Sequence, residues 1–195
     1  MIDQNGALLP NGLPQARARL GVGQGIAIAV GLVISVAASA GVGWVAFNQQ
    51  RVVDQAAVWQ YAPDAAIASY AQRTDLTDEG SFLFFASRPQ VSTGQLFNDI
   101  CSAHQEDVGI LGCYVPTTRQ IHLYDVTDPR LDGLEEVVAA HELLHAAWDR
   151  MSAAERDTLA PLLEAEAAKH ADDTDFAATL EFYQRTEPGE RLNEL

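Results

Sequence analysis

The longest run of hydrophobic positions lies near the N-terminus, where no charged residue occurs between Leu20 and Gln50. Its strongly apolar core, residues 25–47, would reach roughly 35 Å as a helix at about 1.5 Å per residue. The hydrocarbon core of a bilayer is about 30 Å thick. The pattern therefore predicts a transmembrane helix over 25–47, preceded by a polar and disordered cytoplasmic tail over residues 1–24.

The residues around this span indicate its orientation. Arg17 and Arg19 precede it and favour an N-terminus in the cytoplasm, while Trp44 lies near its far end, where aromatic residues are typical of the membrane interface. The competing interpretation is a signal peptide cleaved after the small residues 38–40, which would give a secreted protein. The apolar run continues to Phe47, which favours an uncleaved anchor. Both interpretations export the rest of the chain.

Shorter periodic patterns follow the span. They predict helices over 49–61 and 63–72, a strand over 81–86, a short helix over 94–100, and strands over 112–115 and 120–126 around a turn. The predicted class is α+β: a transmembrane helix and a mainly helical domain, residues 80–195, with a short antiparallel sheet. The intervening helical segment, residues 48–79, is either a spacer or packs on the domain. His122 and Tyr124 are expected on a face opposite Ile121, which is solvated or, in the alternative, lines a cleft.

The C-terminal part reads as three helices. Ser152 and Glu155 form a capping box for a helix to Lys169, which Pro161 is expected to kink or restart. A second helix is expected from the polar residues 172–175 to about Arg185. The last short piece follows a Pro-Gly break at 188–189.

The most informative periodicity runs over residues 134–151, which contain no proline. One helical stripe holds apolar residues together with two histidines: Leu134, Val138, His141, His145 and Trp148. Asp132 and Glu135 before and within its first turn resemble a capping box in which Asp replaces Ser or Thr. The pattern predicts a partly buried helix beginning after Gly133.

This helix carries candidate chemistry. His141 and His145 are four residues apart, so their imidazoles lie one turn apart on one face and can reach one metal ion. Glu142 is beside them and can take a proton from a water on that ion. Buried histidines without partners cost free energy, and a metal ion would remove that cost. The alternative is that both are ordinary core or surface residues, since so short a pattern also arises by chance.

The sequence His141-Glu142-Leu143-Leu144-His145, with its uncharged flanks over residues 137–148, resembles the active-site helix of the zincin metallopeptidases. The resemblance implies a bound Zn²⁺ held by His141 and His145, and it implies that Glu142 is the general base for attack of water on a peptide carbonyl. It also implies an edge strand beside the helix, with which an extended substrate pairs. The strand predicted over 120–126 would take that place, and the alternative is that it belongs to an ordinary core hairpin.

A catalytic zinc usually keeps three protein ligands and one open position. The metzincin branch would have Gly at position 148 and His at position 151, where this chain has Trp148 and Met151. The closer resemblance is to gluzincins, which take a glutamate from a later helix, often after an asparagine. Glu194, which follows Asn193, is the first candidate for the third ligand, and Glu190 is the second.

The C-terminal glutamates also fit a solvated acidic helix face. The chain stops at Leu195 within a helical pattern, so the native protein is expected to continue, because a ligand beside a terminus is poorly held. Tyr183 and Arg191 are candidate donors to a developing oxyanion by residue type alone.

Cysteines and charge complete the prediction. Cys101 and Cys113 are expected to form a disulfide in an oxidising compartment, stabilising the fold by roughly 3 kcal/mol, although two buried free thiols are the alternative. Gly109 and Gly112 between them would supply turn flexibility. Of the 27 acidic and 12 basic residues, 26 and 10 follow Phe47, a balance of −16. So acidic a domain is expected to bind no nucleic acid and to be repelled by anionic lipid.

Together these patterns predict a zinc-dependent peptidase, anchored in the cytoplasmic membrane by one helix, that hydrolyses a peptide or protein substrate outside that membrane. The alternative is a non-catalytic envelope protein with a structural or vestigial metal site. The sequence does not indicate the oligomeric state or the substrate.

Overall fold

A computed structural model describes residues 21–101, 110–186 and 191–194. The chain forms two compact units that divide between Asn48 and Gln49. The first contains α1, Val22–Phe47. In the described ranges, α1 is the one helix long and apolar enough to cross a membrane, a property that membrane anchors and signal sequences share, and none of its residues is buried within the protein.

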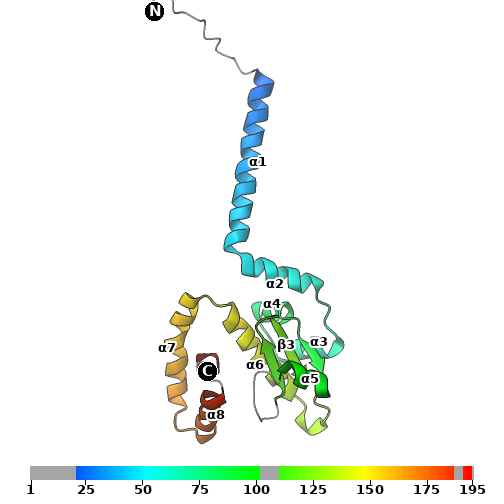
Figure 1. Cartoon of the computed structure of the whole chain (residues 1–195), viewed down its shortest axis with the longest axis vertical. Coiled ribbons are helices and arrows are strands. Elements are labelled where there is room, and N and C mark those ends of the chain that lie inside the picture. The colour runs from blue at the N-terminus through cyan, green and yellow to red at the C-terminus, as the bar shows by residue number, and fades with distance from the viewer. Residues whose placement is uncertain (1–20, 102–109, 187–190, 195) are drawn as a thin grey trace, which may run out of the picture. The chain divides into compact units, whose positions relative to one another are not determined.

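The second unit contains the remaining elements, which are mostly helical (Figure 1). In chain order these are α2 (Gln49–Gln60), α3 (Ala65–Arg73), α4 (Asp78–Ala86), β1 (Gln90–Ser92), α5 (Gly94–Cys101), β2 (Gly112–Val115), β3 (Gln120–Tyr124), a 3-10 turn (Pro129–Leu131), α6 (Leu134–Arg150), α7 (Ala153–Lys169), α8 (Thr174–Thr186) and α9 (Arg191–Glu194). The predicted helix over 134–151 is α6, and the predicted short helix over 94–100 is α5. The predicted hairpin is β2 and β3.

The sheet differs from the prediction in two ways. Its strand order is β1-β3-β2, with β3 antiparallel to β2 but parallel to β1. The sheet is therefore mixed rather than purely antiparallel. Because β3 is the central strand, the prediction that residues 120–126 form an edge strand is also wrong. The missing piece was β1, whose three residues carry too little periodicity to be recognised in the sequence.

The prediction of a strand over residues 81–86 is wrong as well, since these residues belong to helix α4. Thr77 caps that helix by accepting a hydrogen bond from the backbone N–H of Gly80 at 3.1 Å. Asp78 and Glu79 occupy the first turn, where acidic side chains favour the positive end of the helix dipole. These start signals outweigh the strand propensity of the aromatic run that follows.

Helix α6 packs across one face of the sheet, together with α3 and α4. The core between them contains Ile121 and Leu123 of β3 and Ala139, Leu143 and Ala146 of α6. Contacts of α2 with α4, and of α3 with α6, show that the segment after the membrane-compatible helix packs on the domain and is not a spacer.

Helix α5 covers the opposite face of the sheet. Its last residue, Cys101, forms the predicted disulfide with Cys113 of β2. His122 is the cross-strand partner of Cys113 and is buried, while the Phe97 ring of α5 meets the Tyr124 ring edge-on. The expectation of a solvated face at His122 and Tyr124 is therefore wrong, because α5 closes it.

The predicted capping box at the start of α6 is absent. The N-cap is Gly133, whose φ of 94° suits glycine, and it makes no side-chain cap. Asp132 instead accepts a hydrogen bond from Arg73 at 3.0 Å. Glu135 accepts hydrogen bonds from the hydroxyl of Tyr70 at 2.8 Å and from the backbone N–H of Val126 at 3.1 Å. Both carboxylates therefore bind residues outside α6 and do not cap the start of the helix.

The C-terminal helices follow the prediction more closely. Ser152 and Glu155 form the predicted capping box of α7, and Asp173 caps α8 by accepting from the backbone N–H groups of Asp175 and Phe176. Pro161 lies inside α7, which runs through it as one helix without the predicted restart. The Pro-Gly break at 188–189 lies outside the described residues.

Candidate metal centre

Helix α6 brings the two predicted histidine ligands together. The Nε2 atoms of His141 and His145 are 3.0 Å apart, and their ring planes stand at 88° to each other. Two nitrogens bound tetrahedrally to one zinc at about 2.05 Å would be roughly 3.3 Å apart. The two nitrogens are at hydrogen-bond distance from each other, and a shift of either one by a few tenths of an ångström would give the separation that one zinc ion requires.

The protonation state of His141 also suits a metal ligand. Burial and, to a lesser extent, the neighbouring His145 together lower the pKa of His141 from 6.5 to about 4. The imidazole is consequently neutral at pH 7, and neutral imidazole is the form that binds metal ions.

Glu142 lies between the histidines in sequence, and its side chain is packed against strand β2. It is 5% exposed, and a Cβ atom placed on Gly112 would lie 2.9 Å from its Oε1 atom and 2.4 Å from the Cγ1 atom of Val138. No side chain fits at position 112 without displacing one of them. Gly112 thus belongs to a strand and allows close approach of α6, instead of supplying turn flexibility as predicted.

The edge strand beside the motif helix is β2. It pairs with β3 on one side, packs on α6, and has no second strand partner among the described residues. The sequence singled out the correct hairpin but the wrong strand of it. Gly112 was the signal that could have corrected this, because an isolated glycine in a strand often marks a close approach of another element.

The third ligand is not placed by the described residues. Glu190 and the side chain of Glu194 lie outside them. Within the described ranges, no group of three His, Cys, Asp or Glu side chains is arranged to hold a metal ion. Helix α9, which contains Asn193 and the backbone of Glu194, does pack against α6. The first-choice ligand therefore stands on a helix that contacts the motif helix.

The two predicted oxyanion donors have other partners. The guanidinium group of Arg191 binds Glu164 of α7 through two hydrogen bonds of 2.9 Å, and this pairing lowers the pKa of the Glu164 carboxyl. The ring of Tyr183 contacts that of Phe182 on α8. Neither assignment gains support from these contacts.

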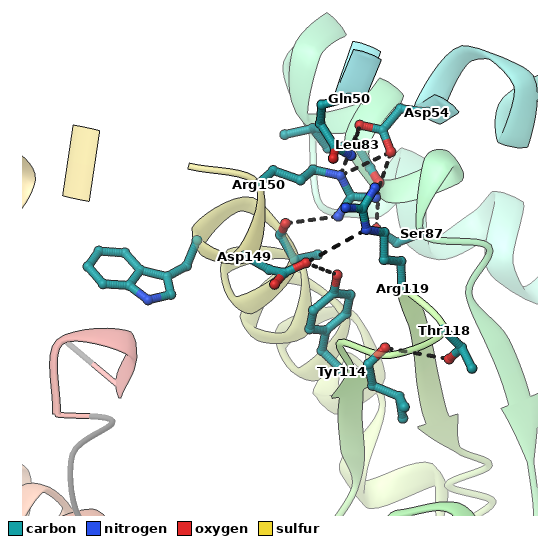
Figure 2. A network of polar contacts seen from close by, with 12 residues as sticks. Gln50, Asp54, Leu83, Ser87, Tyr114, Thr118, Arg119, Asp149 and Arg150 are labelled. Atoms are coloured by element: carbon teal, nitrogen blue, oxygen red, sulfur yellow. Dashed lines mark hydrogen bonds and ion pairs between the residues drawn. The ribbon is translucent and has the colours of Figure 1, made fainter. Parts of the chain in front are cut away.

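A buried ion pair holds the C-terminal end of the motif helix (Figure 2). Arg150 donates hydrogen bonds to both carboxylate oxygens of Asp54 on α2, at 3.0 to 3.2 Å, and to the backbone carbonyl of Ala146 at 2.8 Å. Gln50 donates a further hydrogen bond to Asp54 at 2.9 Å. Ala146 follows His145 directly, so this network fixes the turn of α6 that bears the second histidine.

A second polar group braces the same turn from the sheet. The hydroxyl of Tyr114 on β2 donates a hydrogen bond to Asp149 at 2.9 Å, and burial raises the pKa of Tyr114. Arg119, in the turn after β2, lies 4.0 Å from Asp149. Figure 2 shows both side chains pointing toward Asp149.

Comparisons with protein-family models, with curated proteins and with solved structures find no match for this chain.

Proposed function

We propose that the chain is a zinc-dependent peptidase, anchored in the cytoplasmic membrane by α1, that hydrolyses peptide bonds outside that membrane. The observation that carries this proposal is the convergence of His141 and His145, whose Nε2 atoms are 3.0 Å apart, beside a buried glutamate on the same helix. The third ligand in this proposal is Glu194, with Glu190 as the second choice.

A zinc ion held by these residues would supply a Lewis acid that polarises the scissile carbonyl and lowers the pKa of an attacking water. The protein's own side chains would position the ion and transfer protons. His141 and His145 would hold the ion through their Nε2 atoms. Glu142 would accept the proton of the water as it attacks and would donate it to the leaving amine.

The position of Glu142 supports an extended peptide as the substrate. Its carboxylate contacts the edge strand β2 at Gly112. An extended peptide that pairs with the open side of β2 would pass next to this carboxylate. Main-chain pairing would give affinity with little side-chain selectivity.

Export of the domain is supported by its covalent chemistry. The Cys101–Cys113 disulfide is typical of proteins outside the cytoplasm. Together with an apolar helix of membrane-spanning length, it favours an anchored domain on the outer side of the membrane. Lipid bilayer and peptide substrate are the partners in this proposal.

The test is hydrolysis by the full chain in phospholipid nanodiscs with one equivalent of zinc, screened against a library of internally quenched peptides. Glu142→Gln should reduce turnover by about 10²–10⁴-fold while zinc stays bound, because a general base contributes about that factor. Glu181→Gln on α8, where the side chain is exposed, is the matched control, and it should leave turnover unchanged.

Turnover that survives Glu142→Gln with zinc bound would contradict the mechanism. Zinc binding by the wild-type chain without hydrolysis of any library peptide would favour the other candidate, an envelope protein whose metal is structural.

A further inference from the structure

Helix α2 has one face fixed to the domain. Asp54 on this face is buried by the guanidinium group of Arg150 and by the amide of Gln50. On the flank of this face, Arg51 forms an ion pair with Glu79 of α4, and its guanidinium lies 3.8 Å from the centre of the Phe82 ring. Both charged side chains of α2, Arg51 and Asp54, are therefore paired with residues of the domain.

The other side of α2, which we term its outer face, is apolar. Val52, Ala56 and Trp59 follow at positions i, i+4 and i+7, with Val53 beside them. The side chain of Trp59 is 78% exposed, and that of Val53 is 53% exposed. No charged residue lies on this face, whose remaining positions are Gln49 and Gln60. A large tryptophan left in water on an uncharged helix face requires an explanation.

Chain connectivity places the first residue of α2 near the end of the apolar helix. Asn48 is the single residue between Phe47, which ends α1, and Gln49, which begins α2. Consecutive Cα atoms are about 3.8 Å apart, so α2 must begin within roughly 8 Å of the end of α1. If α1 crosses a bilayer, α2 starts in the headgroup region.

We propose that the outer face of α2 lies in the lipid headgroup region, with Trp59 and Val53 inserted at the boundary of the acyl chains. Tryptophan is enriched at this depth, and interfacial helices bind by burying such an apolar face. The occupant is lipid and not an acidic protein surface, because the face offers no charge. Lipid on one face of α2 and the Asp54–Arg150 pair on the other would hold the motif helix near the bilayer.

This inference rests on the proposed membrane anchor, and the three tryptophans of the chain allow both to be tested at once. Trp44 reports on α1, Trp59 on the outer face of α2, and Trp148 on the motif helix, where it lies beside Arg156. Three full-chain variants would each keep one tryptophan and replace the other two with Phe. Each would be reconstituted in phosphatidylcholine vesicles with and without lipid brominated at a shallow acyl position.

The expected result is strong quenching by brominated lipid for Trp44 and Trp59, a blue-shifted emission for Trp59, and no bromine quenching for Trp148. If Trp59 emits as it would in water while Trp44 is quenched, the inference is overturned, but the proposed membrane anchor is still supported. A blue-shifted Trp59 that bromine does not quench would also overturn it, because the face would then be covered by protein, such as a second copy of the chain. Unquenched Trp44 would overturn the anchor and the inference with it.

Quenching of Trp59 has a matched control on the domain surface. Leu162 of α7 is more exposed than Val53, at 63% against 53%, and lies far from the span in the sequence. Leu162→Trp in a background without other tryptophans should give water-like emission and no bromine quenching. Equal quenching at positions 59 and 162 would overturn the assignment of the lipid contact to α2.

Discussion

The motif helix α6 and the C-terminal helices α7 and α8 differ in how they are held. Helix α6 buries side chains from Glu136 to Ala146 against the sheet and against helices α3 and α4. Among the described residues, α7 buries Ala167 alone and α8 buries none. The C-terminal helices are fastened instead by polar contacts, such as those from Arg156 to the carbonyls of Trp148 and Asp149.

This difference separates two parts of the proposed site. The histidine pair and Glu142 stand on an element that the domain core fixes, so their geometry precedes any metal. The candidate third ligand stands on α9, which is held by contacts such as the exposed Arg191–Glu164 pair. Elements with few buried contacts open locally at low free-energy cost. A metal bound by both parts would therefore stabilise the C-terminal helices more than the core.

The largest effect on stability is expected for Arg150→Ala, on the core side of the motif helix. It leaves the Asp54 carboxylate buried without its cation, since both side chains of this pair are less than 10% exposed. Breaking such a pair costs about 3–5 kcal/mol. The free energy of unfolding from urea titration measures it. Arg156→Ala is the control at the junction with α7. If it lowers the free energy of unfolding as much as Arg150→Ala does, α7 is held as firmly as α6.

Two leucines compare the helices directly. Leu143 of α6 is 6% exposed, and Leu162 of α7 is 63% exposed. Leu143→Ala should lower the free energy of unfolding by about 2–5 kcal/mol through a cavity in the core. Leu162→Ala should change it by less than about 0.5 kcal/mol. Equal losses in thermal or urea unfolding would show that α7 is packed as tightly as α6.

Gly112→Ala tests the contact between β2 and Glu142. The added methyl group overlaps Val138 and the Glu142 carboxylate, so the free energy of unfolding should fall by about 1–3 kcal/mol. Peptide hydrolysis should fall further than the folded fraction does, because the carboxylate moves. A variant with unchanged stability and turnover would show that β2 does not constrain Glu142.

Arg191→Ala is expected to have a small effect on the C-terminal side. The Arg191–Glu164 pair is 40% and 46% exposed, and exposed pairs contribute about 0–1 kcal/mol. Urea unfolding of the metal-free chain measures this change. A loss above about 2 kcal/mol would place α9 among the firmly packed elements.

The smallest effect concerns pH and the buried face under α5. Burial lowers the pKa of His122, so this imidazole stays neutral in the folded chain at a pH where the unfolded chain binds a proton. Stability should therefore decrease as the pH falls below about 6.5, the pKa of an unperturbed histidine. Comparing urea unfolding at neutral and mildly acidic pH for the wild type and His122→Gln should show a shallower decrease in the variant. If the wild type and the variant show the same pH dependence, His122 does not cause the loss of stability at acidic pH.

Local patterns predicted much of this fold. The stripe along residues 134–151, the capping box at Ser152, the two cysteines and the hairpin strands each depend on neighbouring residues, and the structure confirms them. The prediction of a strand over residues 81–86 failed because a short aromatic run fits a strand or a buried helix equally well. The cap at Thr77, which lay before the run, would have decided between them.

Long-range pairings were beyond local patterns. The parallel pairing of β1 with β3 made β3 central, and nothing in the three residues of β1 indicates a partner. The Asp54–Arg150 pair joins residues 96 positions apart. Asp132 and Glu135 match a capping box in the sequence. In the structure they accept hydrogen bonds from Arg73 and Tyr70 of another helix instead. For the site, helical spacing predicted that His141 and His145 would converge, whereas the role of Gly112 depended on how α6 crosses the sheet.

Zinc binding by His141 and His145 is the property on which the proposed function depends. The most direct measurement is the zinc content of the purified full chain by elemental analysis, beside His145→Ala and the control His170→Ala on the C-terminal end of α7. We expect one zinc per chain in the wild type and in the control, and none in His145→Ala. A wild-type chain without zinc, or undiminished zinc in His145→Ala, would contradict it.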